Sequence, residues 1–169
     1  IEITLPAAMT VIPFGASEAE VVAEHGDGTK TWRYETNRAG GILYAGDYVR
    51  EEIQAGGLTI DFYYGRKHQA VMEAAGAAEA VRAVMDYCAG HYGSLAFGDG
   101  ERLKLIQSRV AGGGYAGDGA SLLDEADFTA HNLGDAGKGG GAAEVMIHEL
   151  VHQWWGLGNM FDTADPWSA

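Results

Sequence analysis

Cysteine is nearly absent from this sequence. The 169 residues include a single cysteine, Cys88, so an internal disulfide is excluded. Cys88 falls on an apolar helical stripe, which favours a small buried core residue over a reactive thiol. The lack of paired cysteines is compatible with the cytoplasm and with the exterior of a bacterial cell.

Positive charge is also scarce. Lys and Arg number 11 against 24 Asp and Glu, which gives a net charge of −13. Binding to nucleic acid and docking on an anionic membrane both need clustered cations, so this composition argues against both. The acidity instead indicates a solvated surface.

Long apolar runs are missing as well. None approaches the roughly 18 residues that a membrane-spanning helix needs, so we expect no membrane insertion of this segment. The sequence shows no signal peptide and no initiating Met, and its sharpest motif stands close to its end. We therefore expect a piece of a longer protein.

The apolar pattern that is present predicts an α+β fold. Strands are expected at residues 1–5, 9–12, 29–36, 58–64 and 103–110. A long helix is expected between the last two of these strands. The helix is predicted over residues 68–92, where apolar residues repeat at steps of three and four. That buried stripe consists of Val71, Ala74, Ala78, Val81, Met85, Cys88 and Tyr92. Gly76 would cost this helix about 1 kcal/mol relative to Ala, so we expect a close packing contact there.

Glycine and acidic residues cluster in the second half of the chain. Two glycine-rich stretches, 112–119 and 134–141, predict loops, and the first has no dinucleotide-binding spacing. Three carboxylates follow within residues 121–128, at Asp124, Glu125 and Asp127. An exposed acidic turn is favoured there over a weak cation site.

The strongest chemical signal is the run His-Glu-Leu-Val-His at residues 148–152. On a helix, His148 and His152 lie on one face, where two imidazoles can bind one zinc ion. Glu149 between them can act as general base on a water. Val151, Trp154 and Trp155 continue a buried stripe, and Gly156 and Gly158 are typical of a helix end. The competing interpretation is a helix face whose histidines are simply hydrated.

This motif and the Gln-Trp-Trp-Gly that follows resemble the zinc helix of the gluzincin aminopeptidase-like family, which has a thermolysin-like catalytic domain. The resemblance implies that His148 and His152 are zinc ligands and that Glu149 is the base. It also implies a third ligand, a glutamate on the next helix, just beyond Ala169. In that family a β-saddle domain precedes the catalytic domain. The implied division is therefore residues 1–40, the end of a β-domain, and residues 41–169, an incomplete thermolysin-like lobe, with the boundary near residues 37–41.

The same family binds peptide backbone along an edge strand that precedes the zinc helix. The stretch Gly113, Gly114, Tyr115 and Ala116 stands at the corresponding distance and is the implied substrate-binding segment. The glutamate and asparagine of the family pattern do not occur in it.

The sequence thus predicts a zinc-dependent peptidase domain acting on peptide substrates, with little activity while the third ligand is missing. The whole pattern most resembles the peptidase-like domains outside the membrane in bacterial transporter permeases, which implies the extracytoplasmic face of a bacterial membrane; the cytoplasm is the alternative. Two other functions stay open. One is a peptide-binding or sensing domain without catalysis, and the other is a structural extracellular module without metal.

Overall fold

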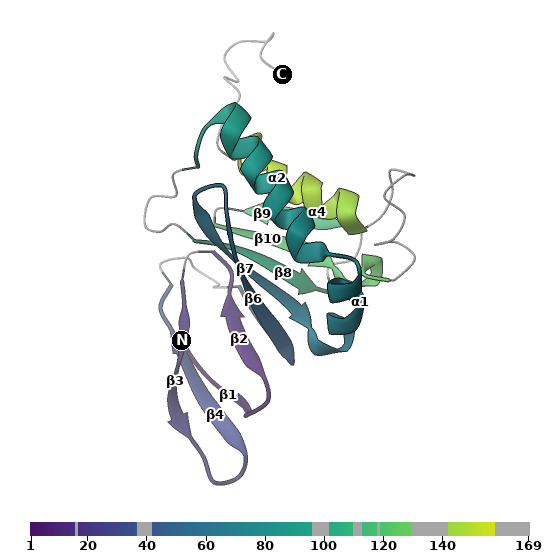
Figure 1. Ribbon diagram of the computed structural model, residues 1–169. Coiled ribbons are helices and arrows are strands. Elements are labelled where there is room, and N and C mark those ends of the chain that lie inside the picture. Colours follow the sequence, from purple (N-terminus) through teal and green to yellow (C-terminus); the bar gives the residue numbers. More distant parts are fainter. Residues whose placement is uncertain are drawn as a thin grey trace.

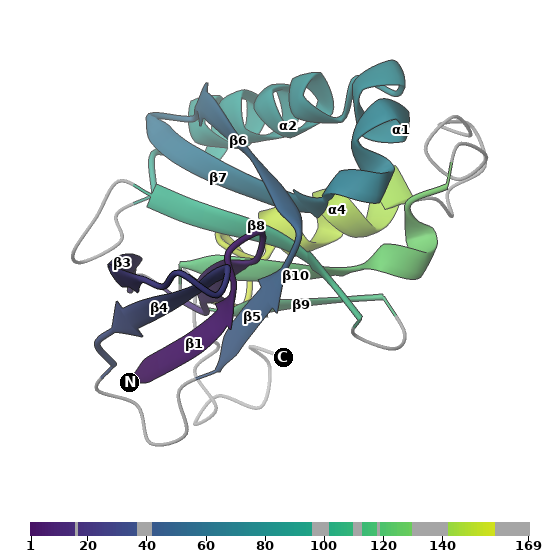
Figure 2. The same cartoon turned by 90° about the horizontal axis from the view of Figure 1, so that it is seen from below.

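A mixed β-sheet with helices on one face forms the centre of the molecule (Figure 1). The computed structural model describes residues 1–15, 17–36, 42–95, 102–109, 113–117, 119–129 and 142–157. Seen from below, α1 and α2 lie on one side of this sheet and the small N-terminal strands on the other (Figure 2). The expected α+β class is confirmed. None of the helices in the described ranges combines the length and the apolar character that a membrane span requires.

The N-terminal strands form two small antiparallel sheets. One has the order β1 (Glu2–Pro6), β4 (Thr29–Tyr34) and β3 (Ala19–Glu24), and the other pairs β2 (Thr10–Pro13) with β5 (Leu43–Gly46). The predicted strands at 1–5, 9–12 and 29–36 are confirmed. β3 was not predicted, because residues 19–24 lack a clear alternation, and its pairing with β4 shifts register between Val21 and Ala23.

The predicted domain boundary at residues 37–41 lies outside the described residues, and the division into two domains stays a prediction. β2 and β5, which come from opposite sides of that position in the sequence, pair in register from Thr10 with Gly46 to Pro13 with Leu43. Ile12 of β2 also packs with Tyr63, Ile106 and Leu122 of the large sheet. The chain before residue 37 therefore contacts the chain after it closely.

The large sheet has five strands in the order β6-β7-β8-β10-β9. Its members are β6 (Tyr48–Ala55), β7 (Leu58–Gly65), β8 (Arg102–Ser108), β10 (Ala120–Asp124) and β9 (Gly114–Gly117). The three central strands β7, β8 and β10 are parallel, and β6 and β9 are antiparallel edge strands. Gly56 and Gly57, with φ of 61° and 80°, form the tight turn between β6 and β7.

The helices cover one face of this sheet. They are the short η1 (Arg66–His68), α1 (Gln69–Ala74), α2 (Ala77–Tyr92) and α4 (Ala142–Val151). Ala78, Val81, Met85 and Cys88 of α2 are buried as their spacing predicts, against Ile60, Phe62, Leu103 and Leu105 of the strands. Cys88 is buried and free, and burial raises the pKa of its thiol.

The prediction of one continuous helix over residues 68–92 was wrong. Gly76 adopts a left-handed conformation, φ 64° and ψ 39°, which separates α1 from α2. Close packing within the described residues does not explain this glycine, because a Cβ there would meet only Glu79 Oε2, at 3.5 Å, among them. The break also shifts the buried face of α1, where Met72 is buried and Ala74 is exposed. Tyr92 was expected on the buried stripe, but it is the last residue of α2 and is 52% exposed, with its ring edge-to-face against Trp155. Gly76 is present for its backbone conformation.

The acidic turn expected over residues 121–128 is only partly present. Residues up to Asp124 belong to β10, where Ser121 and Leu123 are fully buried between β8 and β9. Buried on both faces, this strand has no apolar alternation to reveal it. The turn is limited to Glu125–Asp127, and the carboxylate of Glu125 forms ion pairs with Lys67 and Arg109.

Candidate metal centre

Helix α4 places the histidine motif beside the edge strand β9. Met146 and Leu150 point into the core and are almost fully buried. Beyond the last helical residue, Val151, the chain continues in turns, although the amide of His152 still donates to the carbonyl of His148. Trp154 is buried and its indole N–H donates to the carbonyl of Gly93 at 2.9 Å, which ties the end of α4 to the end of α2.

The turn after α4 corrects one part of the sequence interpretation. Trp155 was expected on the buried stripe, but its side chain is 41% exposed, because the helix ends before it. Gly156, with φ of 99°, follows as a residue typical of a helix end. Gly158 lies outside the described residues.

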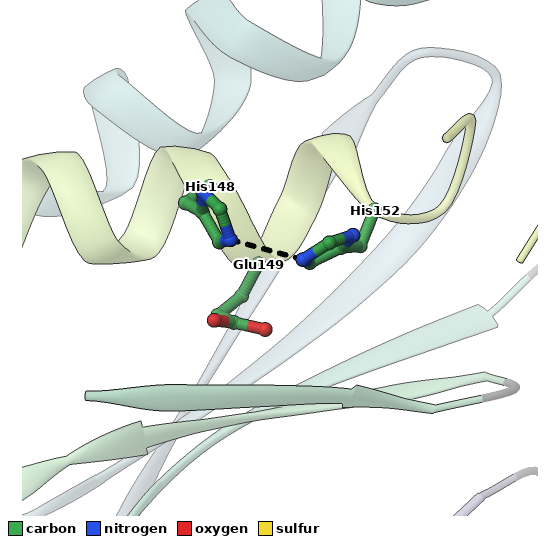
Figure 3. A group of neighbouring side chains, drawn as sticks. All are labelled: His148, Glu149 and His152. Carbon is green, nitrogen blue, oxygen red and sulfur yellow. Dashed lines mark hydrogen bonds between the residues drawn. The ribbon is translucent and has the colours of Figure 1, made fainter. Parts of the chain in front are cut away.

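The two histidine rings meet on the outer side of α4 (Figure 3). Their Nε2 atoms are 3.0 Å apart and the ring planes are nearly perpendicular, at 89°. Nδ1 of His152 lies 3.0 Å from the carbonyl oxygen of Trp155. Because a carbonyl can only accept, this Nδ1 carries the proton, and in the neutral ring Nε2 is left with a lone pair. That lone pair accepts a hydrogen bond from Nε2–H of His148, drawn as a dashed line in Figure 3.

Glu149 points from the same helix toward the strands (Figure 3). Its side chain is only 5% exposed, and burial raises the pKa of its carboxyl, although the neighbouring His152 and His148 act in the opposite direction. A carboxyl with a raised pKa suits general-base chemistry near neutral pH. The ligand atoms of His148, Glu149 and His152 lie within 4.8 Å of one another, and no other group of metal-binding side chains occurs in the described part of the chain.

This donor set fits zinc. Two nitrogens bound to one zinc at about 2.0–2.1 Å and at tetrahedral angles are about 3.3 Å apart. The separation of 3.0 Å between the two Nε2 atoms is close to that value. The hydrogen bond from His152 Nδ1 to a backbone carbonyl is the usual support of a metal-binding histidine, because it fixes both the tautomer and the ring orientation.

Strand β9 brings the predicted substrate-binding stretch against this site. A Cβ on Gly114 would lie 2.5 Å from Cδ of Glu149 and closer still to Cγ and Oε1. Gly113, with φ of 112°, precedes the strand, and Ala116 is half-buried within it. Tyr115 is 56% exposed and lies on the opposite face, with its ring centroid 5.9 Å from that of Phe14. The substrate-binding role of these four residues stays a prediction.

Two polar residues that the sequence did not single out hold α4 on the sheet. The hydroxyl of the fully buried Ser121 donates to the carbonyl of Glu149 at 3.2 Å. Gln153 Nε2 donates to Ser121 Oγ and to the carbonyl of Gly117, both at 3.3 Å. Gln153 directly follows the histidine motif, and that position could have indicated its role in the sequence. No comparable sequence pattern marks Ser121.

An open hollow lies on the outer side of the histidines. Its volume is about 500 Å3, and it is lined by Glu144, Ile147, His148, Val151, His152, Trp155 and Gly156. Ile147 and Trp155 leave 39% and 41% of their surface exposed there. The histidines therefore face an accessible and largely apolar surface.

Comparisons with known proteins add no information on the role of this site. No family model matches the chain, and no curated protein sequence matches it. The assignment therefore depends on the motif and on the geometry described above.

Proposed function

We propose that this chain carries the histidine and glutamate part of a zinc-dependent peptidase centre of the gluzincin, aminopeptidase-like type. One observation carries the proposal. His148 and His152 present their Nε2 atoms 3.0 Å apart, with His152 fixed through Trp155, while the buried carboxylate of Glu149 lies beside them and against β9. Without metal, the same separation is a hydrogen bond between the two imidazoles, so the proposal depends on its combination with the fixed tautomer of His152 and the buried carboxylate of Glu149.

The chain's own groups would then act as follows. Zinc bound by His148 and His152 would supply a Lewis acid that polarises a peptide carbonyl and a water molecule. Glu149 would accept the proton of the attacking water on its carboxylate and donate it to the departing amine. β9 is an edge strand of the large sheet, so peptide backbone can add along it next to Glu149. Gly114 permits this close approach, because it has no side chain between β9 and the carboxylate.

The proposal extends to the rest of the centre and to its setting. The third ligand would be supplied by a glutamate beyond Ala169, so the chain with two histidines alone would bind zinc weakly and hydrolyse little. The parent protein would be a bacterial membrane transporter permease with this domain on the extracytoplasmic side.

A second candidate function is peptide binding or sensing without catalysis. The observation that favours it is the composition of residues 113–116, which contain no carboxylate to hold a substrate amine. β9 would then bind peptide backbone, and the histidine motif would be retained from the fold.

Zinc content and peptide hydrolysis of the full-length natural protein separate these functions. We expect one zinc per chain by elemental analysis, lost in His148→Ala. We expect Glu149→Gln to keep the zinc but to abolish hydrolysis of a peptide library. Zinc without any hydrolysis in the unsubstituted protein would favour the binding function, and absence of zinc from the full-length protein would refute the metal centre.

A further inference from the structure

A second cavity lies where the three parallel strands end. β7 ends at Gly65, β8 at Ser108 and β10 at Asp124, and residues at or just after these ends line the cavity together with the corner between β5 and β6. In open sheets with parallel strands, ligands bind in the crevice beyond the carboxyl ends of the strands. The volume of about 760 Å3 falls in the range of small-molecule sites. This cavity shares no residue with the candidate metal centre.

Two buried polar groups in the cavity wall have no hydrogen-bond partner among the described residues. Gln107 is 2% exposed and its Oε1 accepts from the amide of Gly65 at 2.8 Å, but its Nε2 makes no hydrogen bond to the described protein. Ser108 is 5% exposed, and its Oγ likewise makes no hydrogen bond to the part of the chain that the structure describes. Buried side-chain donors are almost always satisfied, so two adjacent exceptions in one cavity wall indicate a ligand that supplies acceptors.

The charges around the cavity favour an anion. Arg66, Lys67 and Arg109 line it, which is three of the 11 cations in a chain of net charge −13. Among the lining residues, Asp47 pairs with Arg66 at 2.9 Å. Glu125 is shared between Lys67 at 2.9 Å and Arg109 at 2.7 Å, and the hydrogen bond from Lys67 lowers the pKa of its carboxyl. Two carboxylates against three cations leave one positive charge.

Two tyrosines provide a less polar wall. Tyr48 is fixed by its hydroxyl, which donates to the carbonyl of Gln107 at 2.8 Å, and by an edge-to-face contact with Tyr63. Tyr44 lies on β5, and both rings pack against the cluster formed by Ile12, Tyr63, Ile106 and Leu122. The cavity therefore combines aromatic surface with donors and a net positive charge.

We propose that this cavity binds a small organic molecule that carries one oxyanion group, a carboxylate or a phosphate. Gln107 Nε2 and Ser108 Oγ donate to the oxyanion, Arg109 and its neighbouring cations balance its charge, and the carbon part of the ligand lies against Tyr44 and Tyr48. The proposal does not depend on zinc binding or on peptidase activity.

Titrations with benzoate, phenyl phosphate and inorganic phosphate test this site. The shifts to follow by NMR are those of the Gln107 side-chain amide and of the backbone amides of Gly65 and Ser108. We expect saturable binding of at least one aromatic anion. Ser108→Ala should weaken it about tenfold, the usual effect of one hydrogen bond to a charged group. That variant should fold normally, because the Ser108 hydroxyl has no hydrogen bond to the described residues that the substitution could remove.

Charge is tested with a pair of arginine variants. Arg109→Gln should weaken binding several-fold, whereas Arg82→Gln, which removes an exposed cation on α2 away from the cavity, should leave it unchanged. Tighter binding of benzoate would assign a carboxylate, and tighter binding of phenyl phosphate a phosphate ester. Non-saturable shifts with both aromatic anions would overturn the proposal, and so would an unchanged affinity in Ser108→Ala. It would also be overturned by equal losses of affinity in the two arginine variants, or by inorganic phosphate binding as tightly as phenyl phosphate.

Discussion

The contact between Gly114 and Glu149 gives the sharpest test of how the motif helix sits on the sheet. Gly114 has no positive φ, so an alanine there meets no backbone strain. Its Cβ would, however, lie 2.5 Å from Cδ of Glu149, and closer to Cγ and Oε1, where carbon atoms normally stay about 3.5–4.0 Å apart. Because Glu149 is buried, it must be displaced by an ångström or more.

Gly114→Ala should therefore destabilise the protein by about 1–3 kcal/mol, the usual cost of an overpacked site. For a chain of this length, that corresponds to a fall in Tm of roughly 3–10 °C. The assay is urea-induced unfolding followed by circular dichroism, with EDTA present so that bound metal adds nothing to the stability. Gly90→Ala is the matched control. Gly90 lies within α2, no described atom outside its own helix backbone comes within 4 Å of its Cβ position, and the substitution should stabilise by up to about 1 kcal/mol.

A double-mutant cycle decides whether the clash is the cause. Glu149→Ala removes the three nearest atoms, so in that background Gly114→Ala should change stability by less than about 0.5 kcal/mol. The reasoning is refuted if Gly114→Ala is as stable as the unsubstituted protein. It is also refuted if the destabilisation persists in full when Glu149 is alanine.

Two further predictions concern the scaffold. Gly76→Ala should destabilise the protein by about 1–2 kcal/mol, because the φ of 64° at this position is unfavourable for a residue with a Cβ. Urea-induced unfolding checks this, with Gly90→Ala as the control, for which a stability change of opposite sign is expected. Asp61 is fully buried; burial by itself would raise the pKa of its carboxyl, but hydrogen bonds from Arg102 and Arg50 outweigh it and hold that pKa below its ordinary value. A depressed pKa adds stability that is complete above the unfolded pKa of about 3.9 and is lost as the pH falls through the folded value. Asp61→Asn should thus destabilise by about 1–3 kcal/mol at pH 7, with a smaller loss at pH 3; an equal loss at both pH values would contradict this account.

Strands β6, β7 and β10 of the large sheet show where sequence patterns were informative and where they were not. β7 was predicted from its sequence, and its neighbour β6 was missed because Arg50, Glu51 and Glu52 interrupt its apolar pattern. In the structure, Arg50 pairs with Asp61 of β7, a contact that no local pattern reveals. β10 was missed for the opposite reason, because burial on both faces removes the alternation.

The sequence by itself determined the chemistry that α4 can offer. The spacing of His148 and His152 follows from the period of a helix, so their shared face needed no tertiary information. It also determined the apolar stripe of α2, including the burial of Cys88, because a single helix buries one face.

Only the tertiary structure decided how that chemistry is surrounded. The carbonyl of Trp155 reaches His152 because the helix ends at Val151, and Gly114 lies against Glu149 because β9 occupies the edge of the sheet beside α4. The second cavity, which we propose to bind an oxyanion, likewise combines the ends of three strands that are far apart in the sequence. A local pattern records the period of one element, whereas these relations depend on which elements pack together, and that is set by the fold as a whole.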